Sequence, residues 1–189
     1  GAREVNPKAT VHVLWTNSWF DPPKETEAAQ ALMVQGADVL TYHLGSPAVA
    51  RAAEAAGKWV IAYHSDMRSV APQRQLAAVT HHWGGYYTAV AESVLEGKWK
   101  HMGVWGGLKS GMVKLEFVSP AVPAALRERV ADKQAAIMSG RFHPFGAPVV
   151  DAAGETRLPL GIVPSWLSDD ELLKMNYFVQ GVSGALPTR

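Results

Sequence analysis

The stretch that decides the fold is Val11-His-Val-Leu-Trp-Thr-Asn-Ser-Trp-Phe-Asp-Pro22. Val11, Val13 and Trp15 alternate with His12 and Leu14, so a strand is predicted over Thr10–Trp15. Pro22 and Pro23 forbid further strand pairing and start a helix, predicted over Lys24–Gln35. The loop between them therefore follows the carboxyl end of a strand, the edge at which open α/β sheets bind ligands.

Two large aromatic side chains, Trp19 and Phe20, lie in this loop. Rings of this size are costly to leave in water, so they either cover a neighbouring helix or stack on a flat ligand. Both interpretations stay open from the sequence alone.

The first half of the chain repeats the strand-then-helix plan. Further strands are predicted over Asp38–His43, Trp59–His64 and Gln75–His81, with helices over Pro47–Ala56 and Gly84–Glu96. Helices of this length between short apolar strands require parallel pairing with right-handed crossovers. The predicted fold class is α/β, with a doubly wound parallel sheet.

The second half is less regular. It predicts strands over His101–Trp105 and Met112–Val118, a helix over Ala124–Ser139, a hairpin around Asp151–Glu155, and a helix from the capping box Ser168–Glu171 to about Gln180. We divide the chain into a ligand-binding α/β domain, 1–105, and a segment, 106–189, that holds a crossover strand, a helix and a carboxyl-terminal extension.

Composition narrows the function. The 189 residues carry a net charge of +1, contain no cysteine and include seven tryptophans. A near-neutral chain lacks the basic field that attracts nucleic acid or anionic lipid, and disulfide and thiolate chemistry are excluded. No apolar run approaches the roughly 18 residues of a membrane span. Many aromatics with little net charge favour recognition of small flat or apolar groups.

The carboxyl ends of parallel strands share one edge, and polar and aromatic residues follow each predicted strand there. The candidate ligand-binding residues are Asn17, Trp19, Phe20, His43, Ser46, His64, Asp66, His82 and Trp83, with Trp105 and Lys109 farther along the chain. A planar heterocycle could be gripped between Trp19 and Trp83. Asp66 could accept hydrogen bonds from a ring N–H, an amine or a sugar diol, and the histidines could donate or accept.

Metal binding and catalysis are the competing interpretations of this edge. The pair His81-His82 could join His43 and Asp66 around a zinc or iron ion. Adjacent residues of a strand point to opposite faces, however, so the pair cannot easily share one ion. The His-Glu-x-x-His, Gly-x-Ser-x-Gly and P-loop signatures are absent from the sequence. We therefore expect no metal, no cofactor and no catalytic residue.

An ordered set of motifs resembles the basic membrane protein (BMP, PnrA-like) family of substrate-binding lipoproteins of ABC importers. The set comprises Asn6-Pro-Lys-Ala-Thr-Val, Trp15-Thr-Asn-Ser-Trp-Phe-Asp-Pro, Gln35-Gly-Ala-Asp-Val-Leu, Ser65-Asp66-Met and Gly106-Gly-Leu-Lys-Ser-Gly111. The likeness covers nearly the whole chain and is to the carboxyl-terminal part of such a receptor. The opening Gly1-Ala-Arg-Glu-Val-Asn-Pro7 reads as the end of a helix, so we expect that an amino-terminal lobe, a signal peptide and a lipid-carrying cysteine precede it.

The resemblance implies a type I periplasmic-binding fold, in which two α/β lobes close over a ligand and deliver it to ABC permease subunits. It implies a periplasmic or cell-surface protein, held to the membrane only through the lipid anchor of the absent part. Family ligands are largely purine nucleosides, with a tryptophan-rich branch for purine bases. By position, Trp19 resembles the base-stacking residue and Asp66 the acid that receives ligand hydrogen bonds. The Gly106–Gly111 run resembles the return crossing toward the other lobe.

Two departures from the nucleoside receptors favour a bare purine base. Those receptors tend to carry Asp before the Ser-Asp pair and Lys on the fourth strand, whereas this chain has His64 and Thr80-His-His-Trp83. Two functions from other classes remain open: an α/β hydrolase or deaminase acting on a heterocycle, and a ligand-sensing receptor for a signalling partner.

Overall fold

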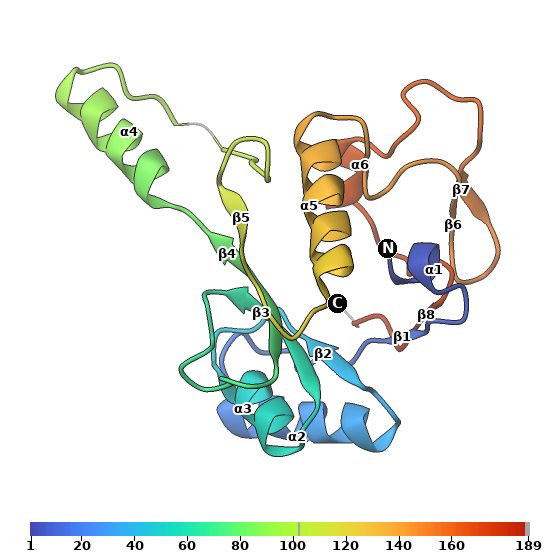
Figure 1. Ribbon diagram of the computed structural model, residues 1–189. Helices are drawn as coiled ribbons and strands as arrows, with labels where there is room; N and C mark the ends of the chain where they lie inside the picture. The colour runs from blue at the N-terminus through green and yellow to red at the C-terminus, as the bar shows by residue number, and fades with distance from the viewer. Residues whose placement is uncertain (102, 188–189) are drawn as a thin grey trace. The chain divides into compact units, whose positions relative to one another are not determined.

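The computed structural model describes residues 1–101 and 103–187, which form two compact units (Figure 1). Unit 1 comprises Gly1–Asn17 with the described part of Ser139–Arg189, and unit 2 comprises Ser18–Met138. The division differs from the boundary predicted at residue 105. Strand β5 (Val113–Val118) pairs with β4 (Gln75–His81), and these backbone hydrogen bonds keep residues on both sides of 105 in one unit.

Unit 2 is built on a four-stranded sheet in the order β2-β3-β4-β5, where β2 is Val39–Thr41 and β3 is Trp59–His64. Strands β2, β3 and β4 run parallel, and β5 is antiparallel to β4. The predicted α/β class with parallel pairing is confirmed, and β5 makes one edge of the sheet antiparallel.

Two helices cover one face of this sheet: α2 (Pro22–Val34) and α3 (Ala48–Ala55), which lie side by side in Figure 1. Helix α2 starts where the sequence predicts, because Pro22 and Pro23 occupy its first turn and the Asp21 side chain accepts a hydrogen bond from the Lys24 N–H. The two helices and the strands share one apolar core of Ala29, Leu40, Tyr42, Val49, Ala50, Ala53, Val60 and Ala71.

The remaining helices of unit 2 form where predicted but contribute no buried residue. These are α4 (Gly84–Leu95) and α5 (Ala124–Met138). Helix α4 leaves Tyr87 and Leu95 61% and 87% exposed, although its sequence is as apolar as that of a core helix.

Unit 1 consists of short elements. They are α1 (Ala2–Val5), β1 (Val11–His12), β6 (Val149–Val150), β7 (Thr156–Leu158), α6 (Asp169–Leu173) and β8 (Val182–Ser183). Strands β6 and β7 form the predicted antiparallel hairpin, and the predicted capping box of Ser168 and Glu171 starts α6. Val149, Leu158 and Leu167 form the core of the unit.

Three predicted elements differ from the structure. Of the strand Thr10–Trp15 only β1 forms, and it pairs in parallel with β8 instead of joining the four-stranded sheet. The carbonyl groups of Gly181 and Ser183 accept from the backbone N–H groups of Val11 and Val13, so this pairing satisfies the strand in unit 1.

The strand predicted over His101–Trp105 is not formed by His101 or by 103–105, and Met102 lies outside the described residues. The segment contains Gly103 and is followed directly by Gly106 and Gly107. Glycine weakens a strand because it costs more conformational entropy to order and has no side chain to pack. The last helix ends at Leu173 instead of near Gln180, because the Gln180 N–H donates to the carbonyl of Val150.

Candidate ligand-binding site

Two backbone N–H groups of the Trp19 loop donate hydrogen bonds to side chains. The Phe20 N–H donates to the Ser18 hydroxyl at 3.3 Å, and the Asp21 N–H donates to Oε1 of Glu25 at 3.0 Å. The side chains of Trp19 and Phe20 remain 72% and 66% exposed. The loop is therefore anchored through its main chain while its rings are available for contact.

Gly45 joins this loop to the turn after β2. Its N–H donates to the carbonyl oxygen of Trp19 at 2.8 Å. A Cβ at position 45 would lie 2.9 Å from that oxygen, so only glycine allows the two backbones to approach this closely.

The carboxyl ends of the three parallel strands bring three histidines together, two of them from the candidate set. His43 follows β2, His64 ends β3, and His81 ends β4. His64 is in register with Thr80, so the ends of β3 and β4 lie at the same edge of the sheet. This arrangement is the one that parallel pairing predicts.

Six rings form a continuous series at this edge, which we call the aromatic row: Trp19, His43, Tyr63, His64, His81 and Trp83. Ring centroids are 5.4 Å apart for Trp19 and His43, 5.7 Å for His43 and His64, 5.2 Å for His64 and His81, and 5.8 Å for His81 and Trp83. Within the row the imidazoles lie between the two indoles, and beyond Trp83 the ring contacts continue to Tyr87, which stacks on the Trp83 indole at 6.0 Å. No ring contact joins the indoles directly in the described part of the chain.

Tyr63 contacts the imidazole rings of all three histidines of the row. Its ring centroid is 4.4 Å from that of His43 and 4.1 Å from that of His64. Its hydroxyl forms a 2.8 Å hydrogen bond with Nε2 of His81. Burial raises the pKa of the Tyr63 hydroxyl, which therefore stays protonated.

The side-chain alternation of the strands explains which rings meet. Leu40, Tyr42, Val60 and Ala62 are buried, whereas the intervening Tyr63 and the following His43 point to the opposite face of the sheet. In the parallel register Tyr63 lies beside Val79, and His81 shares the face of Val79. The aromatic row therefore begins on the sheet face away from α2 and α3.

His64 has a left-handed backbone, with φ of 69°, an uncommon conformation for a residue with a Cβ. Its imidazole lies between those of His43 and His81. Desolvation lowers the pKa of His64, and the two neighbouring imidazoles lower it further. Both effects favour the neutral form of the central ring, which can both donate and accept.

Asp66, expected to receive hydrogen bonds from a ligand, is occupied within its own loop. Its Oδ1 accepts from the Arg68 N–H and from Nε2 of Gln75, and its Oδ2 accepts from Nε of Arg68 at 2.7 Å. The Arg68 hydrogen bonds lower the pKa of Asp66 to about 2. Contact with a ligand stays a prediction, and it requires that the carboxylate share or exchange these partners.

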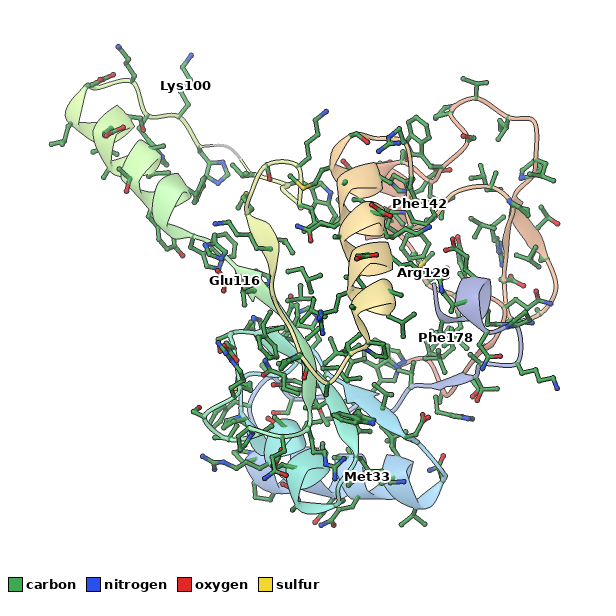
Figure 2. All side chains as sticks on the ribbon, viewed as in Figure 1. Met33, Lys100, Glu116, Arg129, Phe142 and Phe178 are labelled. Carbon is green, nitrogen blue, oxygen red and sulfur yellow. The ribbon has the colours of Figure 1, made fainter. Side chains whose placement is uncertain are left out.

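His82 points away from the row. Its Nε2 lies 2.7 Å from Oε1 of Glu116 on β5 and 3.2 Å from the Thr80 hydroxyl. Figure 2 labels Glu116 on this strand. The alternation argument that separates His81 from His82 is therefore correct, but it places His81, not His82, in the row.

The other predicted residues lie apart from the row or are engaged elsewhere. Ser46 is buried, and its hydroxyl donates to Glu25 and accepts from the Ala48 N–H. Asn17 is the last residue of unit 1 and has a φ of 51°. Trp105 is 63% exposed, and Lys109 is exposed on the turn before β5. Among the described residues, neither has a ring contact or ion pair with the row.

Sequence reasoning left Tyr63 and His81 out of the candidate set. The available signal is the strand period of two: His43, Tyr63 and His81 occupy the open face of three successive strands. Register, which local sequence does not supply, is needed to align them.

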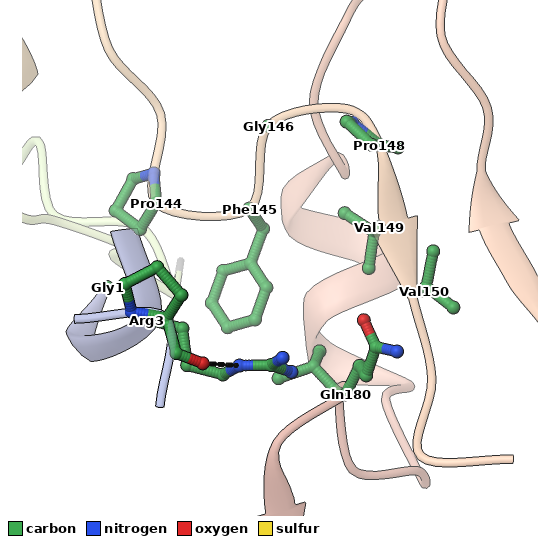
Figure 3. Close-up of a pocket in the computed structure, with 11 residues that line it drawn as sticks. Gly1, Arg3, Pro144, Phe145, Gly146, Pro148, Val149, Val150 and Gln180 are labelled. Carbon is green, nitrogen blue, oxygen red and sulfur yellow. Dashed lines mark hydrogen bonds between the residues drawn. The ribbon is translucent and has the colours of Figure 1, made fainter. Parts of the chain in front are cut away.

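Unit 1 contains a separate pocket of about 580 Å³, shown in Figure 3. Its lining includes Phe145, Pro148, Val149 and Gln180, together with Arg3, whose Nε donates to the Pro7 carbonyl at 3.3 Å. None of the predicted site residues lines it.

Within residues 1–101 and 103–187, no group of three His, Asp or Glu side chains is placed to hold a metal ion. No helix in the same residues is long and apolar enough to cross a membrane.

The rings of the aromatic row lie at the carboxyl edge of a parallel α/β sheet, which is where open sheets of this class bind ligands. The chain belongs to the family described as ABC transporter substrate-binding protein PnrA-like, whose model matches residues 1–147.

Two relatives are similar over the whole chain. A purine-binding protein of Brucella abortus is 40% identical over 187 residues, covering 99% of this chain and 52% of its own length. A putative ABC transporter glucose-binding protein of Haloferax volcanii is 34% identical over 190 residues, covering 100% and 45% respectively. The chain spans about half the length of the curated relatives it matches.

Solved structures confirm the fold. An ABC transporter solute-binding protein from Conexibacter woesei matches with a TM-score of 0.58 and 22% identity over 76% of this chain and 49% of that one. A similar protein from Aeropyrum pernix gives a TM-score of 0.54 and 19% identity over 71% and 47%. The type I periplasmic-binding lobe predicted from the sequence is therefore the fold of this chain.

Proposed function

We propose that this chain forms one lobe of an extracytoplasmic solute receptor that binds a purine base on the aromatic row and delivers it to an ABC permease without chemistry. The observation that carries the proposal is the row itself, in which exposed rings lie at the carboxyl ends of parallel strands. Each aromatic face that stacks on a base contributes about 1–3 kcal/mol. The likeness to the Brucella purine-binding protein supports the ligand class.

A base is favoured over a nucleoside because the row holds no carboxylate for a ribose diol. The nearest acid along β3, Asp66, has its oxygens occupied by Arg68 and Gln75. Within the described residues, no hydrogen bond engages the ring nitrogens of His43 or His64, whose imidazoles contact each other at 5.7 Å. These nitrogens can therefore pair with the edge of a heterocycle.

Glucose is the second candidate ligand, because the Haloferax relative is described as glucose-binding. Indole faces also pack against the apolar face of a sugar ring. A sugar needs many hydroxyl partners, however, and the aromatic row offers few acceptors. We therefore rank a sugar below a purine.

The family supports two further parts of the proposal: transfer of the ligand to a membrane permease, and a location outside the cytoplasm. Substrate-binding proteins of ABC transporters act outside the cytoplasm and dock on permease subunits, and we extend both properties to this protein. A lipid anchor on a preceding segment, a hydrolase or deaminase activity, and a signalling partner are the further alternatives.

The test is calorimetric titration of the complete gene product, since its relatives are about twice as long as this chain. Adenine, hypoxanthine, the matching nucleosides and glucose are titrated separately, and each mixture is then assayed by chromatography for conversion. We expect saturable binding of bases, weaker binding of nucleosides and unchanged ligands. Binding of glucose with inert purines would reject the ligand assignment, and turnover would favour the enzyme alternative.

A further inference from the structure

The most deeply buried charged side chain of unit 2 lies behind the Trp19 loop. Glu25 is 0% exposed. A buried carboxylate is costly unless its oxygens are paired. Oε1 accepts from the Asp21 N–H, and Oε2 accepts a hydrogen bond from the Ser46 hydroxyl. The first turn of α2, where Glu25 lies, also favours negative charge.

These hydrogen bonds connect two loops that are 21 residues apart in sequence. Glu25 holds the end of the Trp19 loop at Asp21, and it holds the turn after β2 at Ser46. The Ser46 hydroxyl accepts in turn from the Ala48 N–H at 3.2 Å, which attaches the turn to the start of α3.

The two loops meet again at Trp19 itself. The Gly45 N–H, one residue before Ser46, donates to the Trp19 carbonyl at 2.8 Å. Trp19 is therefore fixed through its own carbonyl and, two residues later, through the Asp21 N–H. His43, whose ring contacts the Trp19 indole at 5.4 Å, precedes the same turn by two residues.

We propose that Glu25, acting through Ser46 and Gly45, is a positioning residue that holds the Trp19 and His43 rings ready for a ligand. An exposed ring on a fixed backbone loses less conformational entropy on binding than a ring on a loose loop. The role of Ser46 is then to position the site, without contact to the ligand. Only the affinity part of this inference rests on the proposed function.

Fluorine NMR of the protein labelled with 5-fluorotryptophan tests the inference without a ligand. The Trp19 resonance is assigned by its loss in Trp19→Phe. We expect Ser46→Ala to shift and broaden the Trp19 resonance and to weaken purine binding about tenfold. We expect Glu25→Gln to leave the resonance close to its wild-type position and to change the affinity by less than about threefold. Glutamine keeps an acceptor for the Asp21 N–H and offers a donor to Ser46.

Ser119→Ala is the matched control. Ser119 is also buried, at 6% exposed, and its hydroxyl accepts from the N–H two residues later, as that of Ser46 does. We expect it to leave the Trp19 resonance and purine affinity unchanged. If Ser46→Ala does not fold, Gly45→Ala replaces it, because its methyl group would meet the Trp19 carbonyl.

The inference is wrong if Ser46→Ala and Gly45→Ala leave the Trp19 resonance as Ser119→Ala leaves it. A Trp19 resonance that responds as expected, in a protein that binds no purine, would keep the positioning role and reject the proposed function. The two failures are thus distinguishable.

Discussion

The hydroxyl of Tyr63 lies 2.8 Å from Nε2 of His81, across two adjacent parallel strands. The bond fixes the orientation of the His81 imidazole. It also joins the part of the row near Trp19 to the part near Trp83, because Tyr63 contacts His43 and His81 contacts Trp83. Precise placement of the imidazoles therefore depends on a residue that need not touch the ligand.

Replacement of this tyrosine tests that dependence. Tyr63→Phe removes the hydroxyl and keeps the ring, so we expect purine affinity to fall about three- to tenfold, the usual net effect of one hydrogen bond. Calorimetry measures the change. Tyr177→Phe is the control, since Tyr177 belongs to unit 1 and its ring contacts the Arg157 guanidinium. Equal affinities in the two variants would contradict the role of the Tyr63–His81 bond.

Stacking on Trp19 is tested by truncation. We expect Trp19→Ala to weaken purine binding by about 1–3 kcal/mol and Trp19→Phe to weaken it less, because a phenyl ring still stacks. Trp99→Ala serves as the control, since Trp99 is likewise exposed, at 52%, and has no ring contact among the described residues. Undiminished affinity in Trp19→Ala would remove Trp19 from the site.

The parts of the fold that the sequence predicts are those set by local signals. Pro22, Pro23 and the Asp21 cap define the start of α2 within the chain itself. Ser168 and Glu171 do the same for α6. The pairing of β1 with β8 joins residues that are far apart in sequence, and no pattern within Thr10–Trp15 names its partner.

The site was predictable to a similar extent. Strand ends place His43, His64 and Trp83 at one edge without any knowledge of side-chain contacts. To choose between His81 and His82 one must know toward which face of the sheet each side chain points. Whether the Asp66 oxygens already have hydrogen-bond partners depends on the position of the Arg68 side chain. Burial of Ser46 depends on Glu25, which belongs to another element.

His64 makes stability depend on pH. Its pKa is lowered from the model-compound value of 6.5, so between that value and its folded pKa the unfolded chain binds more protons than the folded one. The contribution of His64 to the free energy of unfolding is therefore full above pH 6.5, and it decreases as the pH falls from 6.5 to the folded pKa. The ring is exposed, so the effect is small.

Urea denaturation near neutral pH and near pH 5 measures the effect. His64→Asn removes the titrating group, and asparagine tolerates the left-handed backbone at this position. We expect the midpoint of His64→Asn to change less between the two pH values than that of the wild type. An identical change in both proteins would show that the histidine does not contribute.

The Asp66 loop should lose order in acid. The pKa of Asp66 is lowered from 3.8 to about 2 by its hydrogen bonds with Arg68, so the stabilisation is present above pH 3.8 and is lost as the pH falls through about 2. Asp66 also holds the Gln75 side chain, whose Oε1 accepts from the Met67 N–H at 2.8 Å. Protonation of one carboxyl group therefore loosens the contact of the loop with the start of β4.

Hydrogen exchange of the Met67 and Arg68 amides near pH 4.5 and near pH 1.5 follows this change. We expect protection at the higher pH that is lost at the lower one, and an Asp66→Ala variant, which lacks the acceptor oxygens, with weak protection at both. Asp151→Ala is a control in unit 1, because Asp151 accepts similar bonds from Ala153 and Arg157. Protection that persists in Asp66→Ala would mean that the backbone alone holds the loop, and the carboxylate would then be free for a ligand as first predicted.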